Sequence, residues 1–162
     1  MIKVILAKDL DWSVIKHFNS KEFDDPDYPG SWIYMSARTI ITADRLRNDM
    51  GCKMIIHNRF GVHGAVCMTK GHHSPNSFHN YDNPDICSAI DFHFTETDMP
   101  VREQARRVIH SGFSGIGIYQ DCWRWVNRDS ESYVLPIAYH CDLRKHFQIW
   151  KYEKKDYVYL LR

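Results

Sequence analysis

The chain has 162 residues, a charged fraction of 25% and a formal net charge of +1 at pH 7. This length suits one domain, 1–162, with a real hydrophobic core, and two domains would be cramped. The near-neutral charge gives no electrostatic case for nucleic acid or an anionic membrane surface, and no apolar stretch is long enough to span a membrane. We therefore expect no binding to nucleic acid or to a membrane. We also expect a monomer.

The apolar start of the chain, residues 1–8, is too short for a secretion signal. We therefore expect synthesis in the cytoplasm without a signal peptide. None of the five cysteines forms a Cys-x-x-Cys pair, which argues against a zinc ribbon or a redox motif. In a reducing compartment they are expected to be free thiols.

The N-terminal part predicts little regular structure. Asp11 is predicted to cap a short helix in which apolar residues recur at helical spacing. Residues 19–31 are rich in turn formers and predict a loop. Its acidic run, 24–27, lacks the spacing of a calcium-binding loop, so we expect it to be solvated.

Residues 36–50 give the clearest helix prediction, with Ser36 as its cap and Gly51 at its exit. Four apolar residues form one face of this helix: Ile40, Ala43, Leu46 and Met50. A second helix is predicted to begin after Asp98, with Pro100 in its first turn.

Short apolar runs predict strands at 53–56, 87–94, 115–119, 133–141 and 146–150, and residues 2–6 read as a strand or extended arm. Trp123 and Trp125 alternate with other residues and predict a hairpin arm. The Lys- and Tyr-rich end, 151–162, is assigned no element. Helices in the first two thirds and strands late predict an α+β fold, a small, mainly antiparallel sheet flanked by helices.

His79, Asp91 and His140 form a candidate metal site. Two imidazoles and a carboxylate leave a fourth position for water, which is the arrangement of catalytic zinc. Asp91 lies in an apolar run, where a carboxylate is costly unless something pairs with it, and a metal would do so. The chain has ten histidines, so spacing alone also allows three ordinary, non-ligating residues.

Other residues near these positions compete as ligands. His72 and His73, in a long aperiodic stretch of the kind that is often functional, are alternatives to His79. His93 shares the face of Asp91 and is either a site-lining or a structural histidine. Cys141 neighbours His140, but strand alternation would send its side chain to the opposite face.

Six segments carry a resemblance through most of the chain. They are 18–27, 46–56, Asn76-Ser77-Phe78-His79, Ala89-Ile90-Asp91, 112–119 and 139–144, with Trp150 beyond. In this order they resemble the zinc D-Ala-D-Ala carboxypeptidase family, which shares its fold with hedgehog proteins and several phage endolysins.

The resemblance implies a hedgehog/D-Ala-D-Ala peptidase-like fold and one Zn²⁺ held by His79, Asp91 and His140. It implies hydrolysis of peptide bonds in peptidoglycan stem peptides by a zinc-activated water, as a carboxypeptidase or an endopeptidase. Arg59 lies near the family's arginine for the substrate carboxylate, with an ordinary surface arginine as the alternative. A phage-delivered enzyme acting on the cell wall would fit the missing secretion signal.

Such a reaction needs a carboxylate that takes a proton from water and returns it to the leaving amine. Asp142 is the catalytic candidate, because it lies two residues along a predicted strand from His140 and shares its face. Its alternative role is to orient the imidazole of His140.

The chain also departs from the family. The gap from His79 to Asp91 is twelve residues, longer than usual, and Cys87 stands where glycine is expected. Ile137 stands where many relatives place an acid. This last departure keeps two alternatives open: a non-catalytic zinc-containing module of the same fold, and a structural protein without metal.

Overall fold

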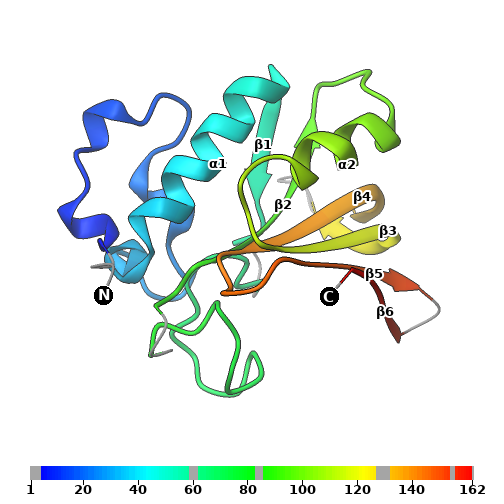
Figure 1. The fold of residues 1–162 in the computed structure, drawn as a ribbon. Helices are drawn as coiled ribbons and strands as arrows, with labels where there is room; N and C mark the ends of the chain where they lie inside the picture. Colours follow the sequence, from blue (N-terminus) through cyan, green and yellow to red (C-terminus); the bar gives the residue numbers. More distant parts are fainter. Residues whose placement is uncertain (1–4, 59–61, 83–85, 127–131, 154–155, 162) are drawn as a thin grey trace.

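The computed structural model describes residues 5–58, 62–82, 86–126, 132–153 and 156–161. Within these ranges the protein has an α+β architecture (Figure 1). Four short 3₁₀ helices, Ala7–Asp9, Trp12–Val14, Ser20–Phe23 and Ser31–Tyr34, precede the helices α1 (Ala37–Met50) and α2 (Val101–Ile109). The strands are β1 (Lys53–Ile56), β2 (Ala89–Thr95), β3 (Gly115–Val126), β4 (Ser132–Asp142), β5 (Gln148–Glu153) and β6 (Asp156–Leu161).

The six strands form one mixed sheet in the order β1-β2-β4-β3-β5-β6. Every neighbouring pair is antiparallel except β3 and β5, which run parallel. The expected α+β class with a mainly antiparallel sheet is therefore confirmed, whereas the hedgehog-like fold stays a prediction.

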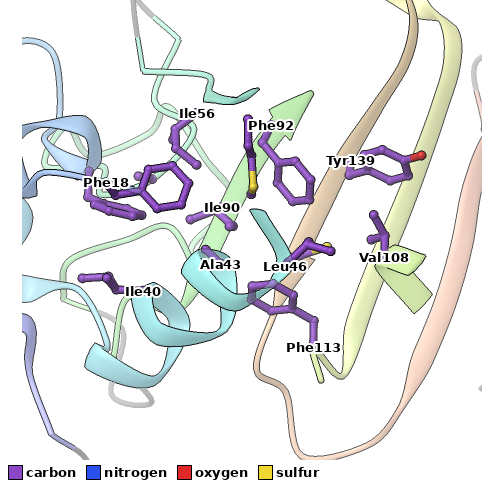
Figure 2. Close-up of a cluster of buried hydrophobic side chains, with 14 of the residues drawn as sticks. Phe18, Ile40, Ala43, Leu46, Ile56, Ile90, Phe92, Val108, Phe113 and Tyr139 are labelled. Carbon is purple, nitrogen blue, oxygen red and sulfur yellow. The ribbon is translucent and has the colours of Figure 1, made fainter. Parts of the chain in front are cut away.

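The hydrophobic core lies between α1 and one face of the sheet. Ile40, Ala43 and Leu46 of α1 are buried in one cluster with Ile90 and Phe92 of β2 (Figure 2). Since side chains alternate along a strand, the intervening residues of β2 point to the other face. Figure 1 shows α1 and α2 on one side of the sheet and the connection from β1 to β2, in green, on the other.

The first helix begins where it was predicted, whereas the second begins two residues later than predicted. Ser36 occupies the N-cap position of α1, but its side chain makes no capping hydrogen bond. Gly51 ends the helix in the left-handed conformation, as expected, with φ 65°. The N-cap of α2 is Pro100 rather than Asp98, because the Pro100 carbonyl accepts the first helical hydrogen bonds, from Glu103 and Gln104.

Three further expectations are corrected. The Asp11 side chain accepts a hydrogen bond from Ser13 N at 3.0 Å, but the helix that it caps is one 3₁₀ turn. The acidic run is solvated only in part, because Asp24 and Asp25 are buried whereas Asp27 is exposed. The C-terminal end, to which no element was assigned, forms β6 against β5. The predicted hairpin is confirmed, because Trp123 and Trp125 both lie in β3 and pair with β4.

Among the described residues, neither α-helix is long and apolar enough to cross a membrane.

Candidate metal centre

The sheet brings two of the predicted ligands side by side on the face away from α1. Asp91 of β2 pairs with His140 of β4, and His140 pairs on its other side with Gly117 of β3. Cys141 lies in the hydrophobic core instead, as alternation predicted. Ile137 is also buried in the core, on the same face as Cys141.

The connection from β1 to β2 supplies the third predicted ligand. His79 Nε2 lies 3.5 Å from Asp91 Oδ1 and 3.2 Å from His140 Nδ1. His140 Nδ1 lies 2.8 Å from the same Asp91 oxygen. The three residues are largely buried and could hold a metal ion. His72 and His73 are not part of this group.

In both His79 and His140, one ring nitrogen makes a hydrogen bond outside the candidate metal group, so the other ring nitrogen faces the group. His79 Nδ1 donates to the Ala65 carbonyl at 2.9 Å, because a carbonyl can only accept. Nε2 of His79 therefore presents a lone pair. His140 Nε2 donates to Asp142 Oδ2 at 3.0 Å, which leaves Nδ1 toward Asp91. Carbonyl and carboxylate partners of this kind fix the tautomer of metal-bound histidines.

Positive charge at the centre of the group would stabilise the buried Asp91 carboxylate. Burial opposes the charged form of Asp91, but His79 and His140 outweigh it and hold the pKa of this carboxyl below its usual range. Burial likewise opposes the charge on His140, but hydrogen bonds to Asp142 and Asp91 raise its pKa to about 9. A proton on His140 supplies part of this positive charge, and a divalent cation would supply all of it.

Asp142 is locked on the outer side of the His140 ring. It has no exposed surface, and its Oδ1 accepts from Arg144 Nε at 2.8 Å. Burial would raise its pKa, but Arg144 and His140 hold it below its usual range. Because Asp142 contacts Nε2, the nitrogen remote from Asp91, its position favours the orienting role over the role of proton acceptor.

The two glycines of β3 make room for this packing. A Cβ atom at position 115 would lie 2.1 Å from Asp142 Oδ1, and one at position 117 would lie 2.7 Å from Trp150 Nε1. Gly115 and Gly117 therefore admit the side chains of Asp142 and Trp150.

The three candidate ligands line a cavity of about 410 Å³. Further lining residues include His73, Tyr119, Arg144, Trp150, Tyr157 and Tyr159. Tyr157 and Tyr159 were missed because β6 was not predicted, although the alternation Tyr157-Val158-Tyr159 is a strand signal.

His73 stands beside the group rather than in it. Its ring stacks on His79 at 4.6 Å between centroids with an interplanar angle of 17°. Its Nε2 donates to the His63 carbonyl at 3.1 Å, so Nδ1 carries the lone pair. Burial lowers the pKa of His73 to about 4, and the ring is therefore neutral at neutral pH.

Two other candidates lie elsewhere. His93 is buried and pairs with His57, whose Nε2 lies 2.8 Å from His93 Nδ1. This contact favours a structural role for His93 over a role in lining the candidate metal site. Arg59, the candidate for binding a substrate carboxylate, lies outside the described residues.

Comparisons with known proteins add no identity to this geometry. No protein-family model, curated protein or solved structure matches the chain.

Proposed function

We propose that the protein is a zinc-dependent peptidase that hydrolyses peptide bonds in peptidoglycan stem peptides. The observation that carries the proposal is the convergence of His79 Nε2, Asp91 Oδ1 and His140 Nδ1 on the wall of one cavity. The order of motifs that resembles the zinc D-Ala-D-Ala carboxypeptidases supports the choice of substrate.

The donor spacing supports zinc. Bonds of about 2.0–2.1 Å to nitrogen and oxygen in a tetrahedron place two ligand atoms about 3.3 Å apart. The three separations in the group are 2.8, 3.2 and 3.5 Å. Three protein ligands would leave the fourth position open toward the cavity, as in catalytic sites.

Bound zinc would lower the pKa of a water molecule toward neutrality and polarise the scissile carbonyl. The chain's own residues would orient the ligands, accept a proton and donate to developing charge. The Ala65 carbonyl and Asp142 hold the two imidazoles in the required tautomer. Burial raises the pKa of Tyr119, so its hydroxyl stays protonated and can donate a hydrogen bond into the cavity.

The proton acceptor is the open point of this mechanism. Asp142 is the second carboxylate in contact with His140, besides the candidate ligand Asp91, but it is held by Arg144 and faces the outer ring nitrogen. His73 lines the cavity and is neutral, and its Nδ1 carries a lone pair. We propose His73 as the competing acceptor and Asp142 as the group that orients His140.

One observation favours a second candidate function, a non-catalytic zinc-containing module that binds the cell wall. Asp91, a ligand, is the one carboxylate among the described residues that line the cavity. A site without a free carboxylate has lost the usual proton acceptor of zinc peptidases. Fold alone does not separate the two functions, because one fold hosts both.

The deciding experiment is release of peptides or D-alanine from purified peptidoglycan, followed by mass spectrometry. The zinc-loaded protein should release products, a chelator should stop release, and added zinc should restore it. His79→Ala should abolish release. His110→Ala is a matched control, because His110 is exposed at the end of α2, outside the cavity.

The product mass would identify the bond that is cut. A folded, zinc-loaded sample that releases nothing from several peptidoglycan types, but sediments with them, would establish the binding module instead.

A further inference from the structure

A second cluster of metal-binding side chains lies in the N-terminal half of the chain. Asp25, His63 and Cys67 each offer a ligand atom, and these atoms all lie within 4.8 Å of one another. All three residues are buried, with exposed fractions of 0%, 3% and 1%. None of them belongs to the first centre.

His63 provides the strongest indication that this cluster binds a metal ion. Its Nδ1 lies 3.1 Å from Asp25 Oδ2, yet neither ring nitrogen makes a hydrogen bond with any described residue. A buried imidazole without a hydrogen bond is costly, whereas a lone pair directed at a shared ion is satisfied. The Asp27 carboxylate lies 3.9 Å from His63 Nε2, on the other side of the ring, where carboxylates commonly orient metal-bound histidines.

The carboxylate of Asp25 is already prepared for such a role. It accepts hydrogen bonds from the backbone N–H of Met68 at 2.7 Å and of Asp27 at 2.9 Å, which fix its orientation. Among the described residues, its one ion-pair contact is His63. A fully buried carboxylate needs compensation by positive charge.

The cluster also sits where it would matter for the first centre. The segment 63–67 forms hydrogen bonds with two of the three candidate ligands of the first centre, Asp91 and His79. Gly64 O accepts from Asp91 N at 2.6 Å, and Ala65 O accepts from His79 Nδ1. His63 and Cys67 are the two ends of this segment. An ion bound to both of these residues and to Asp25 would hold the segment 63–67 in place.

We propose that Asp25, His63 and Cys67 bind a second metal ion, which anchors residues 63–67 and thereby positions His79 and Asp91. One nitrogen, one oxygen and one sulfur donor select Zn²⁺ among common cellular metals. On binding, the Cys67 thiol loses its proton to solvent, and a zinc ion with one thiolate and one carboxylate is neutral overall. Cys67 lines a cavity of about 560 Å³, which meets the first cavity at His73 and gives the ion a path of access.

The test is metal content together with cobalt spectroscopy on the full chain. Wild-type protein reconstituted with zinc should hold two ions per chain, and His79→Ala and Cys67→Ser one each. Cobalt(II) bound to a thiolate gives a strong sulfur-to-metal absorption in the near ultraviolet. The first centre contains no cysteine, so this band should appear in wild type and in His79→Ala and vanish in Cys67→Ser.

Cys52→Ser is the matched control, since Cys52 is a half-buried free thiol outside both groups. It should keep two zinc ions and the thiolate band. If Cys67→Ser does not fold, the spectra of wild type and His79→Ala still decide the question, because the band needs no variant to be seen.

The outcomes separate this inference from the proposed function. One zinc ion that is lost in His79→Ala, with no thiolate band, overturns the second site and leaves His63 and Asp25 as a buried pair. One ion that survives in His79→Ala and shows the band establishes the second site, while the proposed catalytic centre fails.

Discussion

Asp142 Oδ2 accepts a hydrogen bond from His140 Nε2 at 3.0 Å, on the opposite side of the imidazole from Asp91. The ring is thus clamped between two carboxylates, one facing the candidate metal position and one facing away from it. The outer carboxylate is itself held by Arg144. This chain of contacts makes the orientation of His140, a candidate metal ligand, depend on Arg144, which is not part of the candidate group.

Asp142→Asn should therefore weaken zinc binding. Loss of a carboxylate that orients a ligand histidine typically costs about 10–100-fold in metal affinity or activity. Competition with a chromogenic chelator measures the affinity, and peptide release at saturating zinc measures turnover. Unchanged zinc affinity with abolished turnover would instead make Asp142 the proton acceptor.

His73→Gln, in the same two assays, should lower turnover without lowering zinc affinity if His73 is the proton acceptor.

Gly115→Ala should disturb the same clamp from the neighbouring strand. Its new methyl group would lie 2.1 Å from Asp142 Oδ1 and 2.3 Å from Arg144 Nε, so the pair must shift. Overpacking of this kind costs about 1–3 kcal/mol of stability. Urea unfolding and zinc titration should both show a loss. Gly71→Ala is the control: it meets open space at φ +88°, so it should cost about 1 kcal/mol and leave zinc affinity unchanged.

Strand alternation was enough to place His140 and Asp142 on one face and Cys141 on the other, because side-chain direction in a strand is a local property. The pairing of Asp91 with His140 is between two strands, so alternation alone did not predict it. The burial of Asp25 was not predictable in this way. It depends on a hydrogen bond from Met68, forty-three residues later, and the turn residues around Asp25 carry no trace of that contact. The course of the connection that carries His79 is likewise set by non-local contacts, such as the hydrogen bond from Cys67 N to the His79 carbonyl, twelve residues later.

Acid should destabilise the metal-free protein before its carboxylates are protonated. Burial lowers the pKa of His57 to about 3, and of His73 and His93 to about 4, whereas exposed histidine titrates near 6.5. The unfolded chain therefore binds protons that the folded chain does not, and stability falls as pH drops from about 6.5 toward 4. Each histidine contributes a slope of up to about 1.4 kcal/mol per pH unit.

The titration of His140 does not hide this loss of stability at acid pH. Its folded pKa, about 9, is raised, so its contribution is complete below about pH 6.5 and is lost only as pH rises through 9. Urea unfolding of chelated protein at several pH values from about 7 to about 4 measures the slope. His110→Ala, which removes an exposed histidine, should leave the slope unchanged. A flat profile across this range would show that the buried histidines are protonated in the folded state.

Zinc binding to the first centre should release a proton. In the metal-free protein His140 is charged at neutral pH, because Asp142 and Asp91 raise its pKa to about 9 despite burial. Nδ1 must lose its proton before it can bind metal, so affinity should rise with pH up to about 9. Titration calorimetry of Cys67→Ser, in buffers with different ionisation enthalpies, isolates this centre and should give about one proton per zinc ion. Adding Asp142→Asn should reduce the release, since the lost carboxylate no longer supports the charge on His140. Heats that do not depend on the buffer would mean that the zinc replaces no proton, and that His140 is not a ligand.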